Sequence, residues 1–513
     1  MEQYTNSVTA DLRYRNQFIL GPEFPPGFDD WKKIKTKNFM YLTVHPELEV
    51  VQASHKNISI TCLGFLLDPD NPKATDLDIV KNLAENCHNF KLLIEQTARF
   101  GGRWILLYED GKNISLVNDA TGLRQVFYTA GLGKENIWCA SQPRIIADLL
   151  KLQVDGDASD FISYLLSCAS QGTGEPMQRW WPGTGSPYKE IKHLIPNHYL
   201  DINTGCSYRF WPSKEFDNIP LKVAVEEASA TLQGMMLSAS NHFDELTLLI
   251  TGGMDSRLLL AASRTLADKI SYITVDSTYV PSADISIPAS VLSGVGLKHN
   301  VAVSNSRPST EFREVYEQHS MLAHDPTMAY AEALLPYLAR KRVAVTGHDA
   351  GVFRNFYRLP KFASSIRKLT PEMITRLARQ MENHPFAIHS FGEWLEGLND
   401  TYNYNVLDLL YWEQRSSNWL ADWLLGYDLV WKDCVLPLNS RHLLNTMLSV
   451  DEKYRKKKGS TTILHTELIL KLWPAVLRPD LAAEKAPLIK RLKRKARETY
   501  VSVLKNAQLL LVH

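Results

Sequence analysis

The sequence predicts two kinds of domain in one chain: an α+β region with antiparallel strands, then an α/β region built on a parallel sheet. Up to about residue 210, short β-branched and aromatic runs are separated by turn residues, which is typical of antiparallel sheets. After about residue 221, short apolar runs alternate with helical segments, as in βαβ units. A chain of 513 residues has room for two or three domains.

The first region contains several candidate strands and two helical stretches. The segment "EDGKN" at 109–113 has Asp-Gly at its centre and predicts a hairpin turn. Helices are expected at about 77–98 and 143–152. Strands are expected at 58–67, 103–110, 113–119, 125–131 and 136–141.

Two segments rich in Pro, Gly and aromatic residues are interpreted as loops. They are "WWPGTGSPY" at 180–188 and "FWPSKEFDNIP" at 210–220. The second lies where the pattern of the sequence changes, so it is the preferred domain boundary. The domains are therefore predicted at 1–212 and 221–513.

In the second region the predicted strands and helices alternate. Strands are expected at 246–250, 271–275, 299–303 and 342–346, and helices at 223–240, 256–266, 284–294, 310–322 and 328–341. From about residue 362 onward the chain is expected to be mostly helical. Ligands of such sheets bind at the carboxyl ends of the strands, so the site is expected there.

Composition excludes several classes of function. The formal net charge of +1 gives no basis for nucleic-acid binding. The six cysteines are scattered without a CxxC pair, which argues against a metal-thiolate site and favours reduced thiols in a cytoplasmic protein. The first residues have no apolar segment typical of a secretory signal, and no run is long enough to span a membrane.

The most informative stretch is "TLLITGGMDSRLLLAASR" at 247–264, where a short apolar strand leads through a turn into a helix. Free backbone N–H groups at a helix start favour anions, and Gly252 and Gly253 let main chain approach a ligand closely. Thr251 and Ser256 add hydroxyl groups. Asp255 suits a phosphate site only if a cation such as Mg²⁺ bridges the two charges. The alternative is an ordinary helix start capped by Asp and Ser.

The segment "TGGMDSR" resembles the SGGxDS pyrophosphate loop of the N-type ATP pyrophosphatases, and among them the asparagine synthetase family. Segments 101–129, 194–205, 284–299 and 343–353 are similar to other parts of that family, in the same order. The resemblance implies an Ntn-hydrolase-like, degenerate class-II glutamine-amidotransferase domain followed by a PP-loop ATP pyrophosphatase domain. Such enzymes adenylate a carboxylate, release pyrophosphate and let an amine attack the acyl group.

The resemblance also implies a set of ligand-binding residues for ATP and Mg²⁺. Metal binding is expected from Asp255 and Asp349. Nucleotide binding is expected from Ile250, Thr251, Gly252, Gly253, Asp255, Ser256, Val275 and Gly347.

The sequence departs from the family in three places. The nucleophilic cysteine at position 2 is replaced by Glu2, so glutamine hydrolysis is expected to be absent, as in the β-lactam synthetases and lasso-peptide cyclases of the family. Gly351 stands where the second nucleotide loop has a metal-binding aspartate, and Asp349, two residues earlier, either substitutes for it or caps a turn. Thr461 or Thr462 replaces a lysine of the C-terminal helix, with Lys456 to Lys458 and His465 nearby.

Two residues are candidates for removing a proton from the attacking amine. His348 occupies the position of a tyrosine in the β-lactam-forming branch, and neutral imidazole is a competent base. Glu413 is placed near the acidic partner of that tyrosine and would orient the ring. Alternatively, His348 caps the loop and Glu413 pairs with Arg415 or a surface group. Arg257 and Arg354 follow the two loops, where they contact phosphate or a substrate carboxylate, or else pair with a structural partner.

These expectations define a ligase that forms an amide bond from a small-molecule or peptide carboxylate and an amine, as AMP and pyrophosphate are released. Intramolecular closure of a lasso or lactam type, with a precursor peptide or partner protein, is one version. Amidation of a small molecule or sugar acid is another. The third alternative is a non-catalytic homologue that binds a nucleotide or a partner.

Overall fold

The computed structural model describes most of the chain. The described residues are 12–170, 179–278, 280–337, 341–358, 369–379, 381–457 and 461–477. Glu2 and Lys458 lie outside them, so the expectations attached to these two residues stay predictions. In the described residues, no helix combines the length and the apolar character needed to cross a bilayer.

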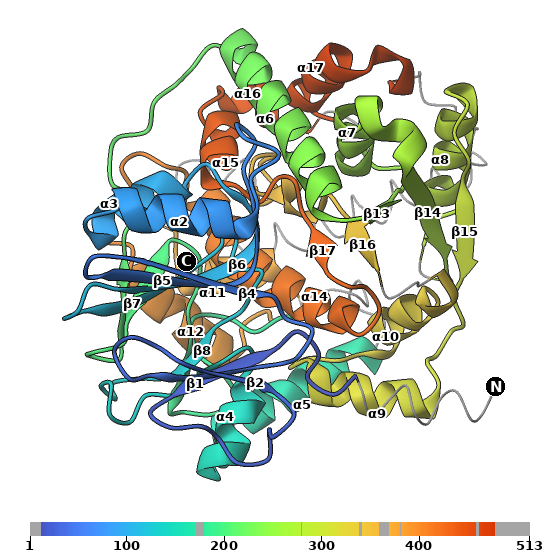
Figure 1. Cartoon of the computed structure of the whole chain (residues 1–513). Coiled ribbons are helices and arrows are strands. Elements are labelled where there is room, and N and C mark those ends of the chain that lie inside the picture. The colour runs from blue at the N-terminus through green and yellow to red at the C-terminus, as the bar shows by residue number, and fades with distance from the viewer. Residues whose placement is uncertain are drawn as a thin grey trace.

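The first half of the chain forms two antiparallel six-stranded sheets that are stacked on each other, as Figure 1 shows. The first sheet has the order β10-β8-β9-β1-β3-β2 and contains β1 (Phe18–Gly21), β2 (Lys32–Lys35), β3 (Tyr41–Val44), β8 (Phe127–Thr129), β9 (Cys139–Ala140) and β10 (Ile191–His193). The second has the order β12-β11-β7-β6-β5-β4 and contains β4 (Val50–His55), β5 (Ile58–Leu67), β6 (Gly101–Glu109), β7 (Ile114–Asn118), β11 (His198–Asp201) and β12 (Cys206–Arg209).

Side-chain alternation along β6 explains the layers. Ile105 and Leu107 face the first sheet, whereas Leu106 and Tyr108 face the other side, because successive residues of a strand point to opposite faces. That other side packs against α2 (Asp76–Asn86) and α3 (Phe90–Thr97). The outer face of the first sheet packs against α4 (Pro143–Leu150). The result is a four-layer helix–sheet–sheet–helix arrangement (Figure 1).

The second half contains a parallel five-stranded sheet with the order β15-β14-β13-β16-β17. Its strands are β13 (Glu245–Leu249), β14 (Ile270–Asp276), β15 (Asn300–Val303), β16 (Arg342–Val345) and β17 (Cys434–Val435). One face packs against α6 (Leu221–His242), α7 (Met254–Ala262) and α17 (Ile463–Leu472). The other packs against α9 (Thr310–His319), α10 (Asp325–Glu332) and α14 (Ala421–Asp428). Helices on both faces are what a parallel sheet requires.

Further helices complete the molecule. The α-helices are α5 (Gly156–Ser170), α8 (Ala283–Gly294), α11 (Pro371–Ala378), α12 (Pro385–Glu396), α13 (Val406–Leu409), α15 (Arg441–Leu448) and α16 (Glu452–Arg455). The 3₁₀ turns are η1 (Arg264–Lys269), η2 (Leu335–Tyr337), η3 (His348–Gly351) and η6 (Pro474–Val476). One element is unusual: η5 (Leu410–Leu420) is a π-helix of 11 residues, a class that is rare and frequent at functional sites.

The predicted fold class is confirmed by this arrangement. Strand β5 spans the predicted 58–67, and the last antiparallel strand ends at Arg209, before α6 begins at Leu221. The helical stretch at 77–98 is two helices, because the Asn89 side chain accepts a hydrogen bond from Leu92 N and starts α3. The strand β17 was not predicted, because only two residues pair with β16.

Buried ion pairs join the two halves. Arg103 of β6 is 1% exposed, and both of its terminal nitrogens donate hydrogen bonds to the carboxylate of Asp428 at the end of α14. Arg124 donates to Asp433, which also accepts from Arg103. Because a buried charge without its partner is strongly destabilising, these contacts fix the antiparallel sheets against the helices around the parallel sheet.

Candidate functional site

The turn after β13 places the predicted loop at the carboxyl end of the central parallel strand. Thr251 N donates to Ser256 Oγ at 3.1 Å, and Ser256 Oγ donates to Thr251 O at 3.2 Å. Arg257, which is buried, donates to Gly252 O at 3.0 Å. Helix α7 begins after Gly253, a residue without a capping side chain. The first N–H groups of α7 are therefore not capped by the side chain of the preceding residue. Free N–H groups and the positive end of the helix dipole favour an anion at this position.

Two glycines of the site are required by close packing. A Cβ atom at Gly252 would lie 2.8 Å from Ala283 O and 2.9 Å from Asp284 Oδ1, at the start of α8. Gly252 N donates to that same carboxylate at 3.0 Å. A Cβ atom at Gly347 would lie 3.0 Å from Asp255 O. Gly252 thus makes room for α8, and its N–H already binds a carboxylate oxygen.

Asp255 is the charged centre of the loop. Its side chain is 22% exposed, pairs with Arg354, and has its Oδ1 3.0 Å from His465 Nε2. Burial alone would raise the pKa of Asp255, but the Arg354 guanidinium and His465 outweigh it and lower the pKa to about 2. Asp255 is therefore an ionised carboxylate over the whole physiological range.

A cavity of about 790 Å³ opens beside Asp255 and is called the loop-side cavity below. Five Arg or Lys side chains and a single carboxylate line it, together with aromatic rings. The described residues in its wall are Asp255, His348, Arg354, Asn355, Phe356, Tyr357, Arg358, Leu377, Ala378, Arg379, Tyr411, Arg415, Trp419 and Lys457. The cavity thus offers a strongly cationic and aromatic environment to a ligand.

The predicted adenine contacts lie at the ends of neighbouring strands. Ile250 and Val275 are each 1% exposed. Ile250 N donates to Ile273 O, and Ile250 O accepts from Thr274 Oγ1 at 2.6 Å. Both backbone groups of Ile250 are therefore used within the sheet.

His348 lies in the wall of the loop-side cavity, as expected for a group that meets a substrate. Its ring contacts Thr346 Oγ1 and packs edge-on against Trp423, with ring centroids 4.5 Å apart. Burial lowers the pKa of His348 to about 4, although the negative charge of Asp255 opposes the shift. The ring is therefore unprotonated at neutral pH and able to accept a proton.

The predicted pairing of His348 with Glu413 is wrong. Glu413 is 0% exposed and forms an ion pair with Arg209 of β12. It also accepts from Asn197 Nδ2 at 3.1 Å and from Trp394 Nε1 at 2.9 Å. Burial favours the neutral form of Glu413, but Arg209 outweighs it and the pKa is lowered. Glu413 thus joins the antiparallel sheets to α12, since its oxygens are taken up by structural partners.

Asp349, the second expected metal ligand, does not line the loop-side cavity. It is 0% exposed, and its Oδ2 accepts a hydrogen bond of 3.3 Å from Thr121, in the antiparallel half. Burial, reinforced by the charge of Asp119, raises the pKa of Asp349 to about 8. These surroundings therefore favour the neutral form of the Asp349 carboxyl group.

The structure also gives a physical reason for Gly351. A Cβ atom there would lie 1.9 to 2.5 Å from ring atoms of Tyr411, which is 3% exposed. The ring of Tyr411 therefore occupies the space that a side chain at position 351 would need. The metal-binding aspartate of the resembling family has no room at this position.

The residues present allow magnesium only through Asp255. The described residues contain no group of three or more His, Cys, Asp or Glu side chains arranged to hold a metal ion. Mg²⁺ commonly keeps water ligands and binds through one or two carboxylates plus substrate phosphates. Asp255, ionised and next to the start of α7, fits that role with a nucleotide present. The ion would then neutralise phosphate charge at the loop.

Sequence reasoning missed the roles of His465 and Arg415. Thr462 caps α17, because its Oγ1 accepts a hydrogen bond of 3.1 Å from His465 N. The same oxygen lies 2.8 Å from His465 Nδ1, and the other ring nitrogen, Nε2, lies 3.0 Å from Asp255 Oδ1. Lys456 pairs with Glu452 at 3.1 Å, whereas Lys457 lines the cavity. The Thr462–His465 spacing is a helix-capping pattern and could have indicated the helix start, but not its neighbour across the fold.

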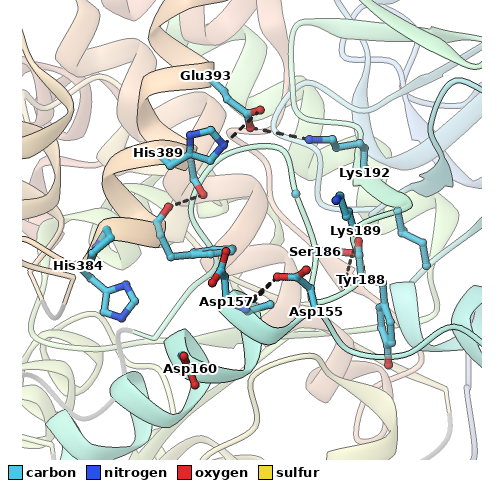
Figure 2. Close-up of a pocket in the computed structure, with 16 residues that line it drawn as sticks. Asp155, Asp157, Asp160, Ser186, Tyr188, Lys189, Lys192, His384, His389 and Glu393 are labelled. Atoms are coloured by element: carbon cyan, nitrogen blue, oxygen red, sulfur yellow. Dashed lines mark hydrogen bonds and ion pairs between the residues drawn. The ribbon is translucent and has the colours of Figure 1, made fainter.

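A second pocket of about 670 Å³ lies between α5 and α12, as Figure 2 shows. Among its charged groups, Glu393 contacts both Lys192 and His389, each at 3.8 Å. Asp155 Oδ1 accepts from Asp157 N at 3.0 Å at the start of α5. None of the predicted site residues lines this pocket. The loop-side cavity is therefore the better candidate.

Comparisons with known proteins leave the function open. No family model matches the sequence, and no curated protein does. The solved allosteric regulatory enzyme of purine biosynthesis is similar at 12% identity and a TM-score of 0.24, over 62% of this chain and 74% of that one. Glutamine phosphoribosylpyrophosphate amidotransferase from B. subtilis is similar at 12% identity and a TM-score of 0.22, over 74% and 76%. At these values the function has to be inferred from the residues of the chain itself.

Proposed function

We propose that the chain is an ATP- and Mg²⁺-dependent ligase that adenylates a substrate carboxylate and joins the acyl group to an amine. The observation that carries the proposal is the position of Asp255. It is an ionised carboxylate at the uncapped start of α7, at the carboxyl end of the central parallel strand, and it opens onto the loop-side cavity. A motif of the SGGxDS type in this place suits the pyrophosphate part of ATP.

In the proposed reaction, the loop after β13 binds the nucleotide and His348 acts on the amine. The N–H groups of the first turn of α7 hold phosphate oxygens, and Asp255 holds Mg²⁺. The ion, when bound, neutralises the charge of the leaving pyrophosphate. His348 faces the acyl group from the cavity wall and accepts the proton of the attacking amine. Its low pKa keeps the ring free of a proton but makes it a weak base.

A second candidate function, nucleotide binding without catalysis, is favoured by one specific observation. Asp255 is engaged by Arg354 and His465, and Asp349, in η3 after β16, accepts a hydrogen bond from Thr121 of the antiparallel half. Two of the groups expected to hold metal therefore have protein partners already. A protein of this kind binds Mg-ATP but does not activate a carboxylate.

The test is ATP–pyrophosphate exchange with a panel of carboxylates, alongside a direct measurement of Mg-ATP binding. Exchange that depends on one carboxylate, and falls roughly 100-fold or more in Asp255→Asn, is the expected result. Asp148→Asn, on the exposed side of α4, is the matched control and should leave exchange unchanged.

Two outcomes would contradict the proposal. If Mg-ATP binds but no carboxylate supports exchange, the non-catalytic function replaces it. If Mg-ATP does not bind to the folded wild-type protein, both candidate functions are wrong.

A further inference from the structure

Arg415 is a buried cation without a carboxylate partner. It lies in the π-helix η5 and is 3% exposed. No Asp or Glu of the described residues pairs with it, and its Nε atom has no hydrogen-bond partner among them. Its polar contacts are with two tyrosine hydroxyl groups: Nη1 donates a long hydrogen bond of 3.5 Å to Tyr357 Oη, and the guanidinium also interacts with the Tyr411 hydroxyl group. Burying a charge in this way is costly unless something compensates it.

Several other buried arginines of the described residues are compensated by carboxylates, whereas Arg441 contacts Asn197 Oδ1 and the ring of Phe210. Arg103 pairs with Asp428, Arg124 with Asp433, and Arg455 with Asp408. Their ion pairs explain why these charges are tolerated inside the fold. The same explanation does not apply to Arg415, so its free N–H group calls for a different partner.

Aromatic rings hold the Arg415 guanidinium in place. Its central carbon lies 4.8 Å from the ring centroids of both Phe356 and Trp419, and 5.9 Å from that of Tyr411. Such contacts offset part of the cost of burial. They also fix the plane of the guanidinium, so that the directions of its N–H groups are determined before a ligand binds. A fixed, planar fork of donors matches a carboxylate.

The surroundings of Arg415 are a ligand site and not a closed core. Arg415, Tyr357 and the three rings all line the loop-side cavity, on whose wall Asp255 also lies. Phe356 is 38% exposed, so part of this aromatic wall is open to solvent. The cavity therefore joins the phosphate loop to a cation held between flat apolar surfaces.

We infer that the loop-side cavity takes an acyl substrate with a second anionic group, a carboxylate, beside a planar apolar part, and that Arg415 with Tyr357 binds this second group. The inference rests on the proposed function only in naming the ligand a substrate. Arg415 is a specificity-determining residue in this assignment. Asp255 and the loop act on the carboxylate that is adenylated. Arg415 binds the second carboxylate, which does not react.

Binding of simple probes to the full chain tests the inference without ATP. The probes are isophthalate and glutarate, which carry two carboxylates, compared with benzoate and butyrate, which carry one, by titration calorimetry at low salt. We expect at least one dianion to bind roughly tenfold or more tightly than its monoanion. Arg415→Gln should weaken the dianion roughly 10- to 100-fold, and Arg144→Gln, on the exposed face of α4, should not.

Two further variants keep the test decisive if Arg415→Gln does not fold. Arg415→Lys keeps the charge but loses the planar fork, and we expect an intermediate loss of dianion affinity. Tyr357→Phe removes only the hydroxyl group, and we expect a loss of roughly two- to fivefold. Circular dichroism confirms that each variant is folded before titration.

Several results would overturn the inference. Equal binding of dianions and monoanions would do so, as would dianion affinity that is unchanged in all the Arg415 and Tyr357 variants. A loss of Mg-ATP affinity in Arg415→Gln, with probe binding intact, would assign Arg415 to the nucleotide. Failure of ATP–pyrophosphate exchange, with dianion binding retained, would contradict the proposed ligase and leave the anion site standing.

Discussion

The loops after β13 and β16 lie side by side, yet their aspartates have opposite environments. Strands β13 and β16 are paired in parallel, so both loops leave the same edge of the sheet. Asp255 is 22% exposed beside Arg354 and His465, and its pKa is lowered to about 2. Asp349 is 0% exposed beside Asp119, and its pKa is raised to about 8. Sequence position alone does not decide the charge of a carboxylate, because burial and the nearest charges do.

Glu413 is a third variant of the same comparison. It is as buried as Asp349, but Arg209 holds it in the ionised form. The three carboxylates thus separate three roles: Asp255 meets the cavity, Glu413 forms a buried ion pair between segments, and Asp349 is a neutral hydrogen-bonding group. Each role predicts a different response to substitution.

The largest effect on stability is expected at Glu413. Glu413→Ala leaves Arg209 without its carboxylate and removes the acceptor of Trp394 Nε1, so we expect a loss of about 3–5 kcal/mol in the free energy of unfolding. Urea unfolding followed by tryptophan fluorescence measures it. Glu393→Ala, at a side chain that is 47% exposed, is the control and should change stability by less than about 0.5 kcal/mol. Equal losses in the two variants would contradict the structural role of Glu413.

A smaller loss is expected when a carboxylate is restored at position 351. Gly351→Asp forces a side chain into the Tyr411 ring and should cost about 1–3 kcal/mol. Gly156→Asp is the control, because a Cβ atom at Gly156 meets nothing within 4 Å. The cost should shrink in a Tyr411→Ala background, which a double-mutant cycle measures. Additive losses would show that Tyr411 is not what excludes a side chain.

A different kind of effect, on the pH dependence of stability, is expected at Asp349. Its pKa is about 8 in the folded protein and about 3.9 in an unfolded chain, so the folded state holds the extra proton between these values. Stability due to this group therefore falls as pH rises from about 4 to about 8, by at most about 1.4 kcal/mol per pH unit. Asp349→Asn removes this contribution.

Unfolding of wild type and Asp349→Asn at pH 5, 6.5 and 8 measures the difference. The variant should gain stability relative to wild type as the pH rises. A difference between the two proteins that stays constant across the series would place the pKa of Asp349 in its ordinary range, and Asp349 would again be a candidate metal ligand.

Local patterns made most of the fold predictable. The β-branched and apolar residues of β5, and the alternation of strands and helices after residue 221, belong to side chains that face a core. Such patterns can be read in the sequence itself. The π-helix η5 and the two-residue strand β17 have no such signal, because neighbours distant in sequence hold them in place.

The sequence by itself determined the two sheet types and the loop from Thr251 to Ser256, because these depend on nearby residues. Only the tertiary structure decided which charged groups meet. It placed His465 on Asp255, took Glu413 to Arg209 and Asp349 to Thr121, and left Arg415 in the cavity wall without a carboxylate. These contacts join residues up to 228 positions apart. The charge state of a group depends on its distance in space from other charges and on its burial. Neither quantity follows from the spacing of residues along the sequence.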